Sequence, residues 1–305
     1  MIRSIKISFA ILIFGLLSCK SHGQITEPGP FISLFQNLYS FNFDDAKTDL
    51  DHLHAIDPDP DLLDIGMANY HWWLINTQRK SEEDRSKMLA SLERIISRYE
   101  NMPPGDLNPD QLFAITHAYA YKTRLDMHEK NYLKGAGNLN KTVQYLDIIL
   151  PNAEDNPKFM LLAGIYHYVA GSIHEKFPLY RPLLALGPKT EMEKGLAMLR
   201  KCAQDKHPMI RTEARYFIMV VKNLIKEDNI RADWYARKLL KEYPKNSYFR
   251  FWRITILADA GKFKETRYEY FKLRSNGEHV QHTQSQQSFL ISESEKYLRK
   301  KNITF

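Results

Sequence analysis

Residues 230–244, IRADWYARKLLKEYP, carry a pattern of small, apolar and proline residues that recurs along the chain. Ala232 occupies a small-residue position of this pattern, and Pro244 occupies its helix-ending position. Residues 261–270 repeat the pattern at a shift of about 34 residues, and residues 43–58 carry a third copy. A fixed period of about 34 residues with these residue types is typical of stacked helix–turn–helix pairs. The pattern therefore predicts an all-α solenoid.

The small residues have a packing role in such a pair. A small residue at the start of the second helix, such as Ala46, Ala232 or Gly195, lets that helix approach the first one closely. A proline after the second helix ends it. Each pair leaves an apolar face uncovered, so we expect about six pairs to stack, followed by a capping helix. The expected helices are 31–41 with 43–56, 62–78 with 82–99, 110–134 with 141–150 across a break at 135–138, 158–176 with 191–204, 208–226 with 230–242, 247–260 with 262–273, and 289–300 as the cap.

With these features the chain resembles the tetratricopeptide-repeat proteins. The match is good over 31–58, 214–244 and 247–273 and looser in between. The resemblance implies a superhelix whose concave face, lined by the first helix of each pair, binds a protein or peptide without catalysing a reaction. Carried over from that family, the concave-face positions are Phe31, Phe35, Leu38 and Tyr39, then Phe217, Val221 and Leu224, then Tyr248, Phe251, Thr255 and Asp259.

The first 23 residues form a predicted signal peptide outside the fold. Arg3 and Lys6 form a basic segment before an apolar core over 7–17, which is about half the length needed to span a bilayer. Residues 16–19, LLSC, resemble a bacterial lipobox in which Cys19 becomes the lipidated first residue; alternatively, cleavage before Gln24 releases a soluble chain. We expect an exported protein with its folded domain over 24–305, either a membrane-anchored lipoprotein or a periplasmic or secreted protein.

Composition and charge narrow the possible partners. The chain is 44% hydrophobic and 26% charged, which argues against a disordered protein. Acidic residues dominate 24–70, whereas Lys and Arg exceed Asp and Glu over 201–305. Either these are solvated helix faces, or the basic end docks on an acidic partner or anionic lipid headgroups. Export makes nucleic acid an unexpected partner. Cys202 lies in an apolar stripe, and we expect it to be buried.

An irregular insertion over 177–190 departs from the repeat. Residues 177–188, FPLYRPLLALGP, are apolar and proline-rich where a short turn is expected. The segment either folds back over the core or forms a rigid lip that presents Tyr180 and Arg181 to a partner.

Motifs for catalysis or metal binding are incomplete in this sequence. His128-Glu129 and His174-Glu175 begin like the zinc motif His-Glu-x-x-His but lack its second histidine. Residues 57–64 begin like a calcium loop but lack its glycine and its final glutamate. We therefore expect no enzyme activity, metal site or cofactor.

The remaining candidates are recognition residues. Tyr70, His71, Trp72 and Trp73 concentrate large side chains on one expected helix, and we expect one tryptophan to face the core and the other to line the groove, where aromatics are favoured anchors. The predicted partner-binding residues are Tyr39, His71, Trp72, Tyr180, Arg181, Phe217, Tyr248 and Phe251.

Two functions of different classes remain open from the sequence. The first is a scaffold or adaptor that binds another envelope protein or peptide in its concave groove. The second is a small-molecule or glycan-binding module that uses the aromatic groove and the 177–188 segment. A broad open groove would favour the first function, and a closed pocket with a few converging polar groups would favour the second.

Overall fold

A computed structural model describes residues 27–56, 59–77, 81–176, 189–225, 228–275 and 284–304. Within these ranges the chain forms thirteen α-helices and two short 3-10 helices, with no strand, which confirms the expected all-α class. The α-helices are α1 (Gly29–Ser40), α2 (Phe43–Ala55), α3 (Pro60–Thr77), α4 (Glu82–Tyr99), α5 (Pro109–His128), α6 (Tyr132–Ile149), α7 (Pro157–Lys176), α9 (Met192–Cys202), α10 (Pro208–Leu224), α11 (Asn229–Glu242), α12 (Ser247–Asp259), α13 (Phe263–Ser275) and α14 (Gln284–Lys300).

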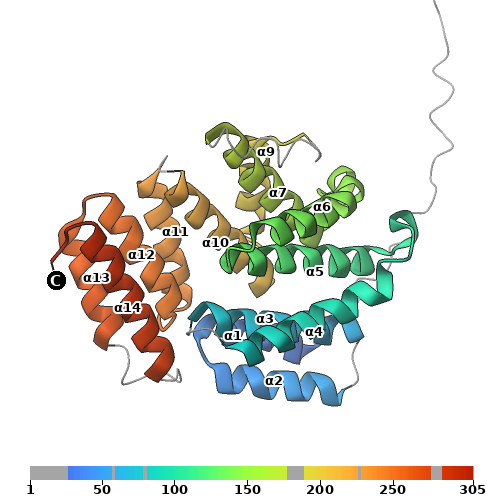
Figure 1. The fold of residues 1–305 in the computed structure, drawn as a ribbon, viewed down its shortest axis with the longest axis horizontal. Coiled ribbons are helices and arrows are strands. Elements are labelled where there is room, and N and C mark those ends of the chain that lie inside the picture. The colour runs from blue at the N-terminus through green and yellow to red at the C-terminus, as the bar shows by residue number, and fades with distance from the viewer. Residues whose placement is uncertain are drawn as a thin grey trace, which may run out of the picture.

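The helices pack in adjacent pairs, as expected (Figure 1). The pairs are α1–α2, α3–α4, α5–α6, α7–α9, α10–α11 and α12–α13, and α14 packs against α12 and α13 as a cap. The predicted small residues lie between paired helices, where Ala46, Ala232 and Gly195 are buried. At Gly195 the approach is so close that a Cβ atom would lie 2.3 Å from the backbone nitrogen of Tyr168.

Local sequence signals place the helix ends. Asn108 begins α5 with a capping box, because its side chain accepts the backbone N–H of Gln111 and the Gln111 side chain accepts the N–H of Asn108. Prolines stand in the first turns of α5, α7 and α10, where the missing N–H has no cost. These signals explain why most expected helix bounds lie close to the observed ones.

The expected break inside the third pair is wrong. The turn lies at 129–131, where Lys130 adopts a left-handed backbone with φ of 63°, and α6 then runs through Gly135 and Gly137. Gly135 faces α5, and a Cβ atom there would lie 3.0 Å from the Met127 side chain. A glycine that looks like a helix breaker in the sequence therefore permits close helix packing.

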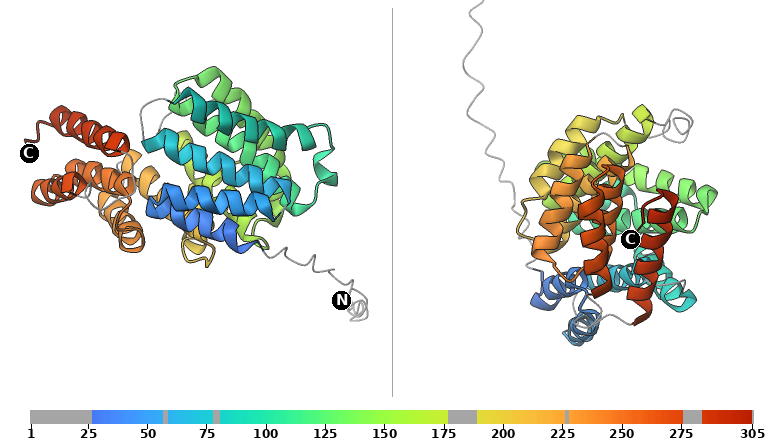
Figure 2. Two further views of the ribbon diagram at one scale, coloured as in Figure 1. Left: turned by 90° about the horizontal axis from the view of Figure 1, so that it is seen from below. Right: turned by 90° about the vertical axis from the view of Figure 1, so that its left-hand side faces the viewer.

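The stack of pairs curves until segments far apart in the chain meet (Figures 1 and 2). The first helix α1 packs against α10, and α3 packs against the cap α14. The Asn246 side chain donates to the carbonyl oxygen of Tyr39 at 2.9 Å, and Gln286 donates to Thr77 at 2.9 Å. Much of the inner face expected to form an open groove is therefore core.

The inner face is filled by aromatic side chains. Tyr39 packs against Trp73 and Tyr243, and Trp73 packs edge-on against Tyr248 and Phe249. Trp72 and Trp73 are both buried, so the expectation that one of them lines a groove is wrong. The reason is that aromatic side chains of α5 pack against Trp72 and those of α12 pack against Trp73. Cys202 is buried, as expected.

Candidate functional site

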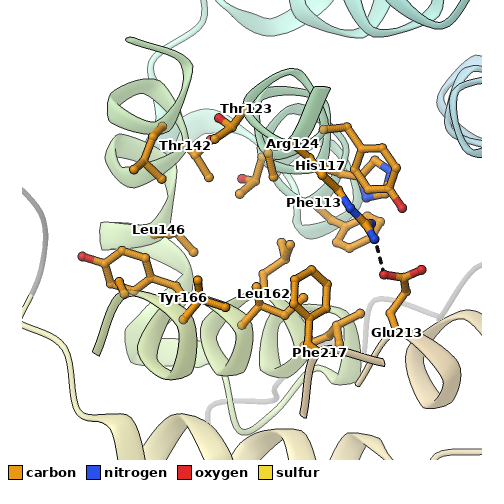
Figure 3. A pocket seen from close by; sticks show the side chains of 18 of the residues that line it. Phe113, His117, Thr123, Arg124, Thr142, Leu146, Leu162, Tyr166, Glu213 and Phe217 are labelled. Carbon is orange, nitrogen blue, oxygen red and sulfur yellow. Dashed lines mark hydrogen bonds and ion pairs between the residues drawn. The ribbon is translucent and has the colours of Figure 1, made fainter. Parts of the chain in front are cut away.

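An apolar cavity of about 280 Å³ lies between α5, α6, α7 and α10 (Figure 3). In the other pairs the second helix packs along the first helix of the next pair, but α6 and α7 pack only weakly against each other. The stacking of the third pair on the fourth is therefore incomplete, and the cavity occupies this seam.

The cavity walls are amphipathic helix stripes. Leu139, Thr142 and Leu146 follow one face of α6 at spacings of three and four residues. Leu162, Ile165, Tyr166 and Val169 do the same on α7, and in Figure 3 Leu146 and Leu162 reach toward the open space from different helices. Such stripes normally bury each other at a helix–helix contact. Here they face an unfilled space, which leaves apolar surface open to a ligand.

A charged pair closes one side of the cavity. Arg124 from α5 donates to the Glu213 carboxylate from α10 at 3.3 Å, and Glu213 also accepts from the Tyr39 hydroxyl at 3.4 Å (Figure 3). The Arg124 guanidinium lies 4.5 Å from the Trp72 ring centroid and 5.3 Å from that of Phe217. Burial acts against the charge of Arg124, but the Glu213 carboxylate together with Tyr121, Tyr216 and Tyr248 outweighs it and raises the pKa of Arg124. Arg124 therefore keeps its charge.

His117 lies in the same wall but is not available as a proton donor near neutral pH. Burial, with a smaller contribution from the charge on Arg124, lowers the pKa of His117 to about 3. The Tyr121 hydroxyl donates to the Asn69 side-chain oxygen at 2.6 Å, and the Asn69 amide group lies 3.2 Å from His117 Nε2. A neutral ring can accept from the Asn69 amide at Nε2, so the chain from Tyr121 through Asn69 to His117 orders the wall of the cavity.

The structure brings several predicted recognition residues together around the Arg124–Glu213 pair. Phe217 lines the cavity, Trp72 lies beneath Arg124, and Tyr39 donates to Glu213. Tyr248 lies one layer further out, with its hydroxyl 3.1 Å from that of Tyr216. Tyr39 and Trp72 are buried, so in this conformation they support the site from behind.

The other predicted residues lie elsewhere. His71 is buried and forms a 2.9 Å contact with Asp84, away from the cavity. Phe251 is partly buried and stacks on Tyr248. Tyr180, Arg181 and Cys19 lie outside the described residues, as does most of the 177–190 insertion.

The sequence reasoning missed Arg124 and Glu213. A signal for Arg124 was present, because Phe113, His117, Tyr121 and Arg124 follow one face of α5 at spacings of four, four and three residues. A charge in an otherwise apolar or aromatic stripe indicates a buried ion pair or a site. The partner on α10 depends on tertiary packing and carried no comparable signal.

The described part of the chain has neither a cluster of metal ligands nor a membrane-spanning helix. Its His, Cys, Asp and Glu side chains form no group of three that could hold a metal ion. None of its helices combines the length and apolar character needed to cross a membrane.

The fold and the cavity define an all-α protein of stacked helix pairs with an apolar cavity in one seam. Comparisons of the chain with protein-family models, with curated proteins and with solved structures found no match.

Proposed function

We propose that this protein binds a small molecule whose apolar part occupies the cavity between α5, α6, α7 and α10. The observation that carries the proposal is the nearly complete apolar lining of a cavity of about 280 Å³. This volume is near the lower end of the range of about 300–1,000 Å³ for ligand pockets. Wetting apolar walls costs about 25 cal/mol per Å² of accessible surface, and an apolar ligand removes that cost.

We propose binding without chemical conversion of the ligand. The titratable groups in the wall are His117, whose pKa is lowered to about 3, the Arg124–Glu213 pair, whose charges neutralise each other, and Tyr121 and Tyr166, whose pKa values are raised by burial. A general acid or base works best with a pKa near the ambient pH, and His117 is far from that range. Arg124, held by Glu213 and by the Trp72 ring, acts as a rigid polar border.

The first experiment measures binding of N-phenyl-1-naphthylamine, a neutral apolar dye, by its fluorescence. Leu139→Trp adds bulk inside the cavity, whereas Leu133→Trp makes the same change at an exposed position of the same helix. We expect Leu139→Trp to raise the Kd at least about tenfold, a loss of about 1.4 kcal/mol, and Leu133→Trp to leave it unchanged. Equal affinity of wild type and both variants, or no binding by wild type, would overturn the proposal.

A second candidate function is an adaptor of tetratricopeptide-like repeats, as expected from the sequence, but with its partner on α13 instead of in the expected concave groove. It is supported by an exposed aromatic face on α13, where Phe263, Tyr268 and Phe271 are 49%, 57% and 53% exposed. Exposed aromatic residues of this kind are common at protein interfaces. The proposed partner is an envelope protein with an acidic surface, because Lys272 lies 4.5 Å from the Tyr268 ring and Arg274 follows it.

The adaptor proposal is tested by affinity purification from solubilised cell envelopes of the native host. A protein recovered in near-stoichiometric amount with wild type should be lost with Tyr268→Ala/Phe271→Ala and kept with the exposed control Leu133→Ala. Recovery that is identical for the two variants would exclude α13 as the binding face.

The lipid anchor stays a proposal that rests on the lipobox at residues 16–19. We expect Cys19→Ala to move the full-length protein from the membrane fraction to the soluble fraction. Unchanged membrane retention would contradict lipidation of Cys19.

A further inference from the structure

The ion pair in the wall of the apolar cavity lies at one edge of the open space. In Figure 3 Leu146 and Tyr166 lie across that space from Arg124 and Glu213. A molecule in the cavity therefore has one end beside the ion pair, while the rest of it contacts mostly apolar side chains.

Arg124 has more hydrogen-bond donors than its neighbours in the wall use. A guanidinium group carries five N–H donors. One of them, at Nη1, donates to Glu213 at 3.3 Å, which is longer than the roughly 2.7–2.9 Å of a strong charged pair, and Arg124 also bonds to the Tyr121 hydroxyl. The Arg124 side chain is 19% exposed and lines the cavity, so N–H groups are left for an acceptor atom of a ligand.

Aromatic rings hold these donors in place. The Arg124 guanidinium lies 4.5 Å from the ring centroid of Trp72, 5.3 Å from that of Phe217 and 5.4 Å from that of Tyr216. A group whose orientation is fixed before binding loses little conformational freedom when a ligand arrives. Arg124 is therefore preorganised to donate to a ligand.

Glu213 keeps the charge at this edge balanced. Its side chain is 7% exposed, and its second carboxylate oxygen accepts from the hydroxyl of Tyr39, which is fully buried. Glu213 is thus tied to Arg124 and to α1. A ligand carboxylate would compete with Glu213 for one guanidinium, and a ligand ammonium group would lie beside Arg124. Either one leaves an uncompensated charge in apolar surroundings, which is costly.

We propose that the cavity selects uncharged ligands, namely apolar molecules with a carbonyl oxygen that accepts a hydrogen bond from Arg124. The inference rests on the proposed function and adds the chemical class of the ligand. A carbonyl oxygen accepts hydrogen bonds without bringing a charge, and the hydrocarbon remainder occupies the space near Leu146 and Leu162.

The first test compares three probes with the same ring system: uncharged 2-acetylnaphthalene, anionic 2-naphthoate and cationic 2-naphthylmethylammonium. Each displaces N-phenyl-1-naphthylamine from the full-length wild-type protein at neutral pH. We expect 2-acetylnaphthalene to bind at least about tenfold more tightly than either ion. Equal or tighter binding of either ion would overturn the selection for uncharged ligands.

Matched double variants locate the carbonyl oxygen. Arg124→Met/Glu213→Gln removes both charges together, so it leaves no buried charge without a partner. It should raise the Kd of 2-acetylnaphthalene about tenfold and change that of 2-ethylnaphthalene, which has a similar shape but no oxygen, by about twofold or less. Arg85→Met/Glu129→Gln makes the same change at an ion pair outside the cavity lining and should leave both Kd values as in wild type. An equal change for both probes in Arg124→Met/Glu213→Gln would overturn the contact with Arg124.

An infrared measurement on wild type checks the same contact without a substitution. Hydrogen bonding lowers the stretching frequency of a carbonyl group, so bound 2-acetylnaphthalene with a ¹³C-labelled carbonyl should absorb at a lower frequency than in hexane. The same frequency in both would overturn the hydrogen bond while leaving the apolar cavity as a binding site. Failure of wild type to bind the dye or any probe would overturn both the inference and the proposed function.

Discussion

At the scale of single residues, the cavity depends on polar groups that are buried in defined states. Arg124 is charged because Glu213 and the surrounding tyrosines together compensate the cost of burying it, whereas burial and the charge on Arg124 both favour the neutral form of His117. Removing one member of such a buried pair leaves the other charge without a partner. This costs far more stability than replacing both members by apolar residues. The wall of the cavity is thus ordered by electrostatics as well as by apolar packing.

The state of His117 predicts a pH dependence of stability. The folded-state pKa of about 3 lies below the ordinary value near 6.5, so the unfolded chain binds the proton first as the pH falls. The stabilising effect of the neutral ring is complete above pH ~6.5 and is lost progressively toward pH ~3. Between pH 7.5 and pH 5, this one group should lower the free energy of unfolding by about 2 kcal/mol.

Urea unfolding at the two pH values checks this prediction. His117→Gln, which can still accept from Asn69, should lose about 2 kcal/mol less than wild type between pH 7.5 and pH 5. The exposed control His54→Gln should follow wild type. The same pH slope in all three proteins would show that His117 is not buried in its neutral form.

At the scale of the helix, close approach within each pair is decided by glycine and alanine. Gly195 of α9 sits against the backbone of α7, whereas Gly137 of α6 has no atom within 4 Å of the position of a Cβ. Each glycine lies inside the second helix of its pair. Comparing the two positions therefore distinguishes the packing role of glycine from its effect on helix propensity.

Alanine substitutions at these two glycines should have opposite effects on the free energy of unfolding. Gly195→Ala places a Cβ 2.3 Å from the backbone nitrogen of Tyr168 and should cost about 3 kcal/mol or more, because backbone atoms must move. Gly137→Ala should stabilise the protein by about 0.5–1 kcal/mol through lower entropy of the unfolded chain. Chemical denaturation measures both, and a stable Gly195→Ala variant would refute the close α7–α9 packing.

At the scale of the whole molecule, the stack of pairs is held by contacts between distant segments. Asn246 both caps α12, by accepting the N–H of Phe249 at 2.8 Å, and donates to the carbonyl oxygen of Tyr39 on α1 at 2.9 Å. This side chain is fully buried, so its two bonds are protected from water. It joins a helix start near the C-terminus to the first helix of the fold.

Replacing Asn246 with aspartate tests this long-range link. Aspartate keeps the cap but cannot donate to Tyr39, and it buries a charge, so Asn246→Asp should cost about 2–4 kcal/mol. Asn108→Asp makes the same change at the exposed cap of α5 and should be neutral or slightly stabilising. Thermal unfolding compares the two variants, and equal melting temperatures would show that the α1–α12 contact does not stabilise the fold.

Local patterns in the sequence were sufficient to predict the helix class, the pairing and most helix bounds. Small residues such as Ala232, end signals such as Pro244 and stripes of apolar residues act over a few turns, so neighbouring residues contain the necessary information. The error at 135–138 shows the limit of this reasoning, because a glycine pair reads as a break until the packing of Gly135 against Met127 is known.

The site depended on tertiary packing. Whether an apolar stripe on α6 meets α7 or faces a cavity is set by how two pairs stack, and no local pattern specifies that stacking. The Arg124–Glu213 pair joins α5 to α10, far apart in the chain. The sequence predicts Tyr39 and Trp72 as groove residues, but the closure of the stack buries them. Repeat patterns reflect contacts within and between neighbouring pairs, whereas the curvature that closes the stack is the sum of small rotations along the whole chain.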